Sequence, residues 1–240
     1  MFPLILCLLS FIPSIILFIY FLHLKTDEDY RTSCKKIMVR GLLSVIGVFF
    51  ASLISRIIYN LLLRDIATPI IADLYTCFVT NAICEEGVKF YSAYSIFKDK
   101  KSTLCAADLI VFLIISAMGF GISEDLVYAF GTTPGQIIVR GLLIAHGSLG
   151  AVMGTLYAVS IKKHSIPLRI LAFVVPIIMH GTYNFGLKDT LPDWSGMVSL
   201  LITVCEFIFL IRTVILLSKH KDDPEYQNPL YPALENQEQQ

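Results

Sequence analysis

Long apolar runs separated by short polar connections make up most of this chain. A helix that crosses a bilayer needs about 20 mainly apolar residues, and the hydropathy pattern contains seven segments of that length. The predicted spans are Leu4–Leu24, Gly41–Leu63, Ile70–Phe97, Leu104–Phe130, Gln136–Ile161, Pro167–Leu187 and Ser195–Leu217. The pattern therefore predicts an all-α, polytopic membrane helix bundle of about seven transmembrane helices.

The composition also predicts a membrane protein whose partner is the lipid bilayer. Hydrophobic residues make up 55% and charged residues 16% of the 240 residues, and the mean hydropathy is +0.70. A soluble domain usually has about 25% charged residues. The formal net charge is zero, so no nucleic-acid partner is expected.

The charges of the connections predict how the helices cross the membrane. The first, third and fifth connections hold five, three and three Lys or Arg residues, where the fifth is counted with Arg169 at the start of the next span, whereas the second, fourth and sixth hold one, none and one. Because positive loops stay cytoplasmic, we expect the N-terminus outside and the C-terminus in the cytoplasm. Residues 1–220 then form the integral membrane helical domain, and the polar residues 221–240 read as a disordered cytoplasmic tail.

A pair of glutamates lies inside the third predicted span. An ionisable group at a helix centre costs about 3 kcal/mol on insertion scales, which makes Glu85, Glu86 and Lys89 conspicuous. Lys89 follows the two glutamates by four and three residues, so it can pair with either of them. A helix-packing salt bridge would need only one glutamate, so the second carboxylate indicates chemistry.

A second acidic motif, Glu124-Asp125 with Tyr128, lies near the end of the fourth span. Glu124 and Tyr128 share a helix face. Twenty residues of helix place Glu124 about 30 Å from the start of the span, near the outer surface. Acids and a tyrosine at an interface are also ordinary membrane anchors, and that alternative stays open.

Two histidines and an amide complete the polar set. His146 is expected near the bilayer midplane, and His180 lies one turn before Asn184 on the same helix face. Each could serve only in hydrogen bonding between helices. Together with Glu85 and Glu86, however, both histidines fall in one layer of the membrane on three helices. The remaining intramembrane charges read as packing pairs or helix-end groups: Arg56, Asp73, Asp108 and Glu206.

The order of these motifs resembles the PrsW family of intramembrane proteases, which is grouped with CAAX prenyl endopeptidases, Abi proteins and Aph-1. The resemblance covers residues 73–188, the predicted protease core, and departs at Asp125, where many relatives have Asn. It implies cleavage of membrane-anchored proteins in a bacterial plasma membrane, with an anti-sigma factor in stress signalling as the model substrate. The site residues that it implies are Glu85, Glu86, His146, His180 and Asn184, supported by Lys89, Glu124 and Tyr128.

The mechanism expected from these residues is hydrolysis by a glutamate-activated water. Glu85 would be the general base, assisted by His146, while His180 and Asn184 would stabilise the oxyanion. Glu86 and Lys89 would keep the local charge balance. No cofactor is expected on this reading.

A zinc alternative stays open at the same place. Glu85, His146 and His180 would suit a catalytic Zn²⁺ with an open fourth position, although the chain has no HExxH motif.

Two non-catalytic functions remain as alternatives to an enzyme. An Aph-1-like scaffold could keep similar histidines, and a small proton-coupled transporter also uses buried acids and histidines. Transporters of this kind often contain an inverted repeat, and the sequence shows none. A scaffold would tolerate Glu85→Gln better than an enzyme would.

Overall fold

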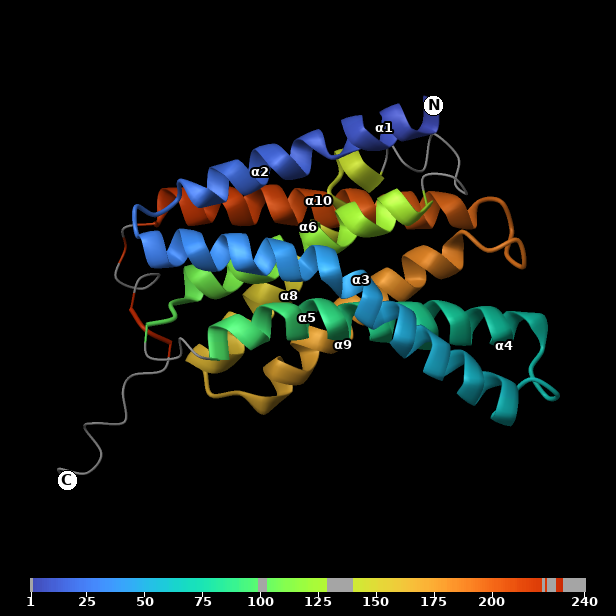
Figure 1. Cartoon of the computed structure of the whole chain (residues 1–240). Coiled ribbons are helices and arrows are strands. Elements are labelled where there is room, and N and C mark those ends of the chain that lie inside the picture. The colour runs from blue at the N-terminus through green and yellow to red at the C-terminus, as the bar shows by residue number, and fades with distance from the viewer. Residues whose placement is uncertain (1, 99–102, 129–139, 222, 224–227, 231–240) are drawn as a thin grey trace, which may run out of the picture.

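The computed structural model describes residues 2–98, 103–128, 140–221, 223 and 228–230. The described part is helical, with no strand beyond a single bridge between Cys105 and Pro229. Figure 1 shows an elongated bundle of helices. The helices are α1 (Phe2–Ser10), α2 (Ile12–Leu22), α3 (Glu28–Leu62), α4 (Pro69–Leu74), the π-helix η1 (Tyr75–Ile83), α5 (Cys84–Phe97), α6 (Ala106–Tyr128), α8 (Ala145–Lys162), α9 (Ile166–Gly186) and α10 (Ser195–Lys219).

Five helical segments of the described chain are long and apolar enough to cross a membrane. They are Glu28–Leu62, Ala106–Val127, Arg140–Lys162, Ile166–Gly186 and Ser195–Lys219. The first predicted span is divided between α1 and α2, and the third between α4, η1 and α5. The chain is therefore a multi-pass membrane protein, as the hydropathy pattern predicts.

The second predicted span differs from its helix at the N-terminal end. Helix α3 begins at Glu28 rather than Gly41, because Asp27 caps it by accepting a hydrogen bond from the Asp29 backbone N–H at 3.0 Å. Four of the five basic residues that the sequence placed in the first connection thus lie on helix, namely Arg31, Lys35, Lys36 and Arg40, whereas Lys25 precedes α3. At 35 residues, α3 is about 52 Å long, so it extends beyond the hydrocarbon core.

Helix α6 is the centre of the bundle. Its side chains are buried on nearly all sides, and it packs against α3 and α8. Glycines make the α3–α6 crossing close: a Cβ added to Gly119 would lie 2.7 Å from the Met38 carbonyl oxygen, and one added to Gly41 would lie 2.5 Å from that of Ser116. Any side chain at these positions would push the two backbones apart.

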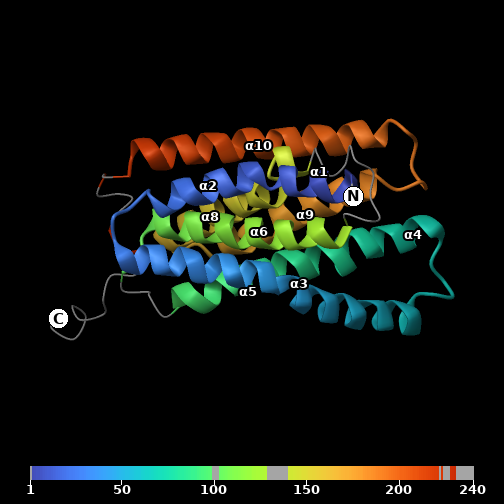
Figure 2. The same ribbon diagram turned by 45° about the horizontal axis from the view of Figure 1, so that its top comes forward.

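The ends of the helices fall into two groups (Figures 1 and 2). The ends of α2, α5, α8 and α10 lie at one end of the bundle, and the turns after α3 and α9 lie at the other. The described parts of the Lys- and Arg-rich connections therefore lie at one end, which is the arrangement that the charge pattern predicts. Which side of the membrane this end faces stays a prediction.

Part of the predicted tail contacts the bundle. The Leu230 backbone N–H donates to the Leu104 carbonyl at 2.8 Å, and Leu230 packs against the hydrophobic core. Residues 231–240 lie outside the described part of the chain.

Candidate active site

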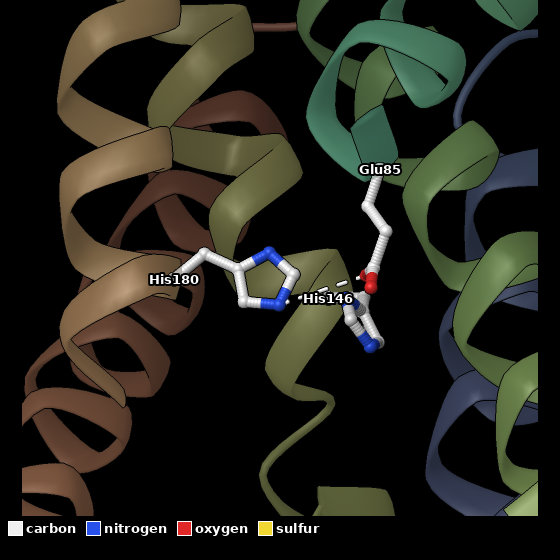
Figure 3. Close-up of side chains that lie close together, drawn as sticks. All are labelled: Glu85, His146 and His180. Atoms are coloured by element: carbon white, nitrogen blue, oxygen red, sulfur yellow. Dashed lines mark ion pairs between the residues drawn. The ribbon is translucent and has the colours of Figure 1, made fainter. Parts of the chain in front are cut away.

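Side chains from four helical elements meet inside the bundle. Glu85, Glu86 and Lys89 come from the first turns of α5, Glu124 from α6, His146 from α8 and His180 from α9; none of the six is more than 8% exposed. Figure 3 shows the side chains of Glu85, His146 and His180 side by side. The structure thus brings together the glutamate pair and the two histidines that the sequence placed in one layer, and it adds Glu124, which the sequence placed near the outer surface.

The backbone before Glu85 is unusual. Residues Tyr75–Ile83 form a π-helix that passes directly into α5. π-helical segments occur frequently at functional sites, because they change the rotation of the residues that follow. Here the change precedes the paired carboxylates and sets the directions in which they point.

Glu86 is the hydrogen-bonded carboxylate of the pair, through one of its two oxygens, while its Oε2 has no hydrogen-bond partner among the described residues. Its Oε1 accepts hydrogen bonds from Lys89 Nζ at 2.7 Å and from His180 Nδ1 at 2.8 Å. With its proton on Nδ1, His180 presents the lone pair of Nε2 on the other side of the ring. Glu86 therefore orients His180.

Glu85 is the carboxylate left available. Its Oε2 lies 3.6 Å from His180 Nε2 and 3.7 Å from Lys89 Nζ. That oxygen is buried and has no hydrogen-bond partner among the described residues. Because a buried carboxylate oxygen without a partner is costly, this arrangement favours a bound water, metal ion or substrate atom at Glu85.

His146 is held from both sides of its ring. Lys89 Nζ lies 2.8 Å from Nδ1, and Glu124 Oε2 lies 2.5 Å from Nε2. Since an ammonium can only donate, Nδ1 accepts and Nε2–H donates to Glu124. Glu124 therefore orients His146, as Glu86 orients His180.

Lys89 links these groups electrostatically. Its ammonium contacts Glu86 and His146 and lies 4.5 Å from the centre of the Phe120 ring. Its backbone carbonyl accepts a hydrogen bond from the Ser116 hydroxyl at 2.7 Å, which ties α5 to α6.

Arg140 is the residue that sequence reasoning missed. Its guanidinium pairs with Glu124 and, through Nε at 3.0 Å, with Asp125. Two adjacent acids buried in a membrane span need a positively charged partner. This requirement was the signal in the sequence that could have led to Arg140. Arg140 thus neutralises the acids behind His146.

The start of α8 explains why Glu124 and His146 meet. The fifth span was predicted from Gln136, with His146 well inside it, whereas α8 begins at Ala145 and residues 129–139 lie outside the described chain. Ile144 precedes α8 in the left-handed region with φ 46°, an uncommon conformation for a β-branched residue. His146 therefore lies in the first turn of α8, level with Glu124.

Two predicted residues stand apart from this cluster. Asn184 lies one turn after His180 on α9 and is half-buried. It takes no part in the hydrogen bonds that join the described cluster residues. The side chain of Tyr128 lies outside the part of the chain that the structure describes.

The donor set fits a zinc ion. One ligand atom each from Glu85, His146 and His180 lies within 4.8 Å of the others. Ligands about 2.0–2.2 Å from a tetrahedral zinc lie roughly 3.3–3.6 Å apart, which matches the 3.6 Å between Glu85 and His180. Each histidine also has the carboxylate partner that metal-binding histidines usually have. Coordination through His146 Nδ1 requires the Lys89 ammonium to move from that nitrogen.

The chain is similar to a known protein family and to a curated relative. A family model described as PrsW family intramembrane metalloprotease matches residues 35–213, more than half of the chain. Among curated proteins, the chain is similar to Protease PrsW of Clostridioides difficile (strain 630), with 27% identity over 154 residues. That alignment covers 59% of this chain and 63% of the relative, less than two thirds of the relative's own length. No solved structure matches the chain.

Proposed function

Because the chain belongs to the PrsW family of intramembrane metalloproteases, we propose that it hydrolyses peptide bonds of membrane-anchored proteins at Glu85, His146 and His180. The observation that carries this proposal is the convergence of three ligand atoms within 4.8 Å, inside the bundle. A packing interaction would satisfy every carboxylate oxygen, whereas Glu85 Oε2 has no hydrogen-bond partner among the described residues.

Each charged residue of the cluster has a distinct task in this proposal. In the form without a metal ion, Glu85 receives the proton of the attacking water, since its Oε2 lies 3.6 Å from His180 Nε2 and has no hydrogen-bond partner among the described residues. Glu86 and Glu124 fix the tautomers of His180 and His146. Lys89 neutralises Glu86 and lies close enough to offset charge that develops near Glu85.

A zinc ion held by Glu85, His146 and His180 would supply Lewis-acid polarisation of the scissile carbonyl and acidify the attacking water. The geometry and the family description favour this form over the metal-free glutamate mechanism expected from the sequence. In either form, Glu86 and Glu124 must hold His180 and His146 in their present orientations.

The substrate class follows from the membrane location and the family. The site is buried among helices that span the bilayer, so a substrate must present its scissile bond at membrane depth. A single-pass membrane protein such as an anti-sigma factor, the substrate that the family resemblance implies, meets this requirement.

The test is cleavage of a single-pass, anti-sigma-like substrate by the full chain in lipid nanodiscs. Glu85→Gln keeps the size of the side chain but removes the base, and kcat should fall by about 10²–10⁴-fold. Glu28→Gln is the matched control, because Glu28 is an exposed acid in the first turn of α3. This control should cleave at the wild-type rate.

Metal dependence is measured on the same samples. Removing bound metal with a chelator should abolish cleavage, and stoichiometric zinc should restore it. Cleavage that survives with no measurable metal would establish the metal-free mechanism instead. Absence of cleavage by correctly folded wild-type protein on several substrates, or normal cleavage by Glu85→Gln, would contradict the proposal and favour the scaffold.

A further inference from the structure

Glu206 is a buried carboxylate on α10 that none of the four motifs includes. It is 3% exposed, and its Oε1 has no hydrogen-bond partner among the described residues. An acid in this position is costly unless something solvates it, so packing alone does not account for it.

A small cavity lies beside Glu206, between α8, α9 and α10. Its volume is about 20 Å³, and Leu149 forms part of its apolar wall. A water molecule needs a cavity of about 10–15 Å³ or more and two to four polar partners. The polar side chains that line the cavity are Arg140, His146, His180, Tyr183, Thr203 and Glu206. The space therefore suits one water molecule.

The cavity adjoins the cluster, because His146 and His180 belong to both. Hydrolysis of a peptide bond consumes one water: its oxygen joins the carbonyl carbon, one hydrogen goes to the departing nitrogen, and the other stays on the new carboxyl group. The bilayer core holds no supply of water. A site inside it therefore needs a place where water is retained.

We propose that Glu206 binds a water molecule in this cavity and supplies it to the Glu85–His146–His180 cluster. Glu206 is then a positioning residue that acts through the water. The statement that hydrolysis consumes this water rests on the proposed function.

The first experiment detects the water without relying on activity. Radiolysis of a bound water produces hydroxyl radicals that label the side chains beside it, and mass spectrometry locates the label. Leu149 is the reporter, since it is 3% exposed and lines the cavity. Leu113, which is 1% exposed on α6 and does not line this cavity, is the internal control.

Two substitutions separate hydrogen bonding from packing. Glu206→Leu removes the polar group, whereas Glu206→Gln keeps an oxygen that can bind water. Leu149 should be labelled in the wild type and in Glu206→Gln, and should fall to the level of Leu113 in Glu206→Leu. Val204→Leu, at an exposed position of the same helix, should behave as the wild type.

Kinetics provide the second measurement. In Glu206→Leu, kcat should fall about tenfold or more with KM unchanged, because misplacing a reacting group can cost about 10²-fold. Glu206→Gln should recover most of kcat. A purely structural role would instead lower the melting temperature of Glu206→Leu and give no recovery of kcat that follows the labelling.

The outcomes separate this inference from the proposed function. Background labelling of Leu149 in the wild type would overturn the inference, and so would equal labelling in Glu206→Leu or an unchanged kcat in that variant. If the wild type cleaves no substrate, the hydrolytic role fails with the proposed function. In that case the labelling alone decides whether Glu206 binds the water.

Discussion

At the scale of single residues, the structure holds two adjacent glutamates differently. Oε1 of Glu86 accepts hydrogen bonds from both Lys89 and His180, whereas Oε2 of each glutamate has no hydrogen-bond partner in the described chain. Neighbouring residues on a helix point about 100° apart. One lysine can therefore contact both carboxylates and form a hydrogen bond with only one of them, Glu86.

Glu86→Gln should weaken zinc binding. The substitution removes the carboxylate that orients His180 Nδ1, and losing such a partner typically costs about 10–100-fold in metal affinity. Competition with a chromophoric chelator measures the affinity in detergent, with Glu28→Gln as the control. An unchanged affinity in a folded Glu86→Gln protein would show that Glu86 does not support the metal ligands.

Arg140→Gln should destabilise the folded state strongly. The substitution leaves Glu124 and Asp125 buried without their cation, and breaking a buried ion pair costs about 3–5 kcal/mol. Unfolding of the protein in mixed micelles measures the free-energy change. Arg64→Gln, at an exposed position, should change it by only about 0.5 kcal/mol, and equal stability of the two variants would refute the role of Arg140.

At the scale of elements, close packing around α6 sets the positions of the site residues. Helix α6 contacts α3 through glycines on one side and α8 on the other. It carries Glu124 to His146, and Ser116 fixes it to the backbone of Lys89. A displacement of α6 would therefore disturb both orienting carboxylates.

Gly119→Ala tests this packing directly. The new Cβ would meet backbone atoms of Met38 and Leu42 at 2.7 and 3.0 Å. Because backbone atoms cannot move aside as a flexible side chain does, the substitution should lower the free energy of unfolding by about 1–3 kcal/mol. Unfolding in mixed micelles measures this change. Gly196→Ala is the matched control, since its added Cβ meets nothing within 4 Å. Equal stability of the two variants would show that the α3–α6 crossing adapts.

At the scale of the whole molecule, the charge pattern and the helix ends support one topology. The described parts of the Lys- and Arg-rich connections lie at one end of the bundle (Figure 1). We expect this end and the C-terminus to be cytoplasmic, with the N-terminus outside.

Fusion proteins measure that orientation. In a bacterial host, green fluorescent protein fused to the C-terminus should fluoresce, and alkaline phosphatase fused there should be inactive. Alkaline phosphatase fused after residue 190, between α9 and α10, should be active. The reverse pattern would invert the predicted topology.

Much of the architecture follows from local sequence. Each long apolar run must form its own backbone hydrogen bonds in lipid, so hydropathy alone locates the helices to within a few residues in α6, α9 and α10. Helical spacing also predicts the Lys89–Glu86 pair, because the contact lies within one turn. The family resemblance rests on the same local motifs, and the family model confirms it.

Other features depend on contacts between distant segments, and only the tertiary structure decides them. The pairing of Arg140 with Glu124 and Asp125 joins residues 16 and 15 positions apart, beyond the reach of helical spacing. The hydrogen bond between Glu86 and His180 joins residues 94 positions apart. Glu206 likewise joins the site only because α10 packs against α8 and α9. Hydrophobicity is a property of each segment and determines which residues enter the membrane, whereas the partner of a buried charge is determined by how the helices pack.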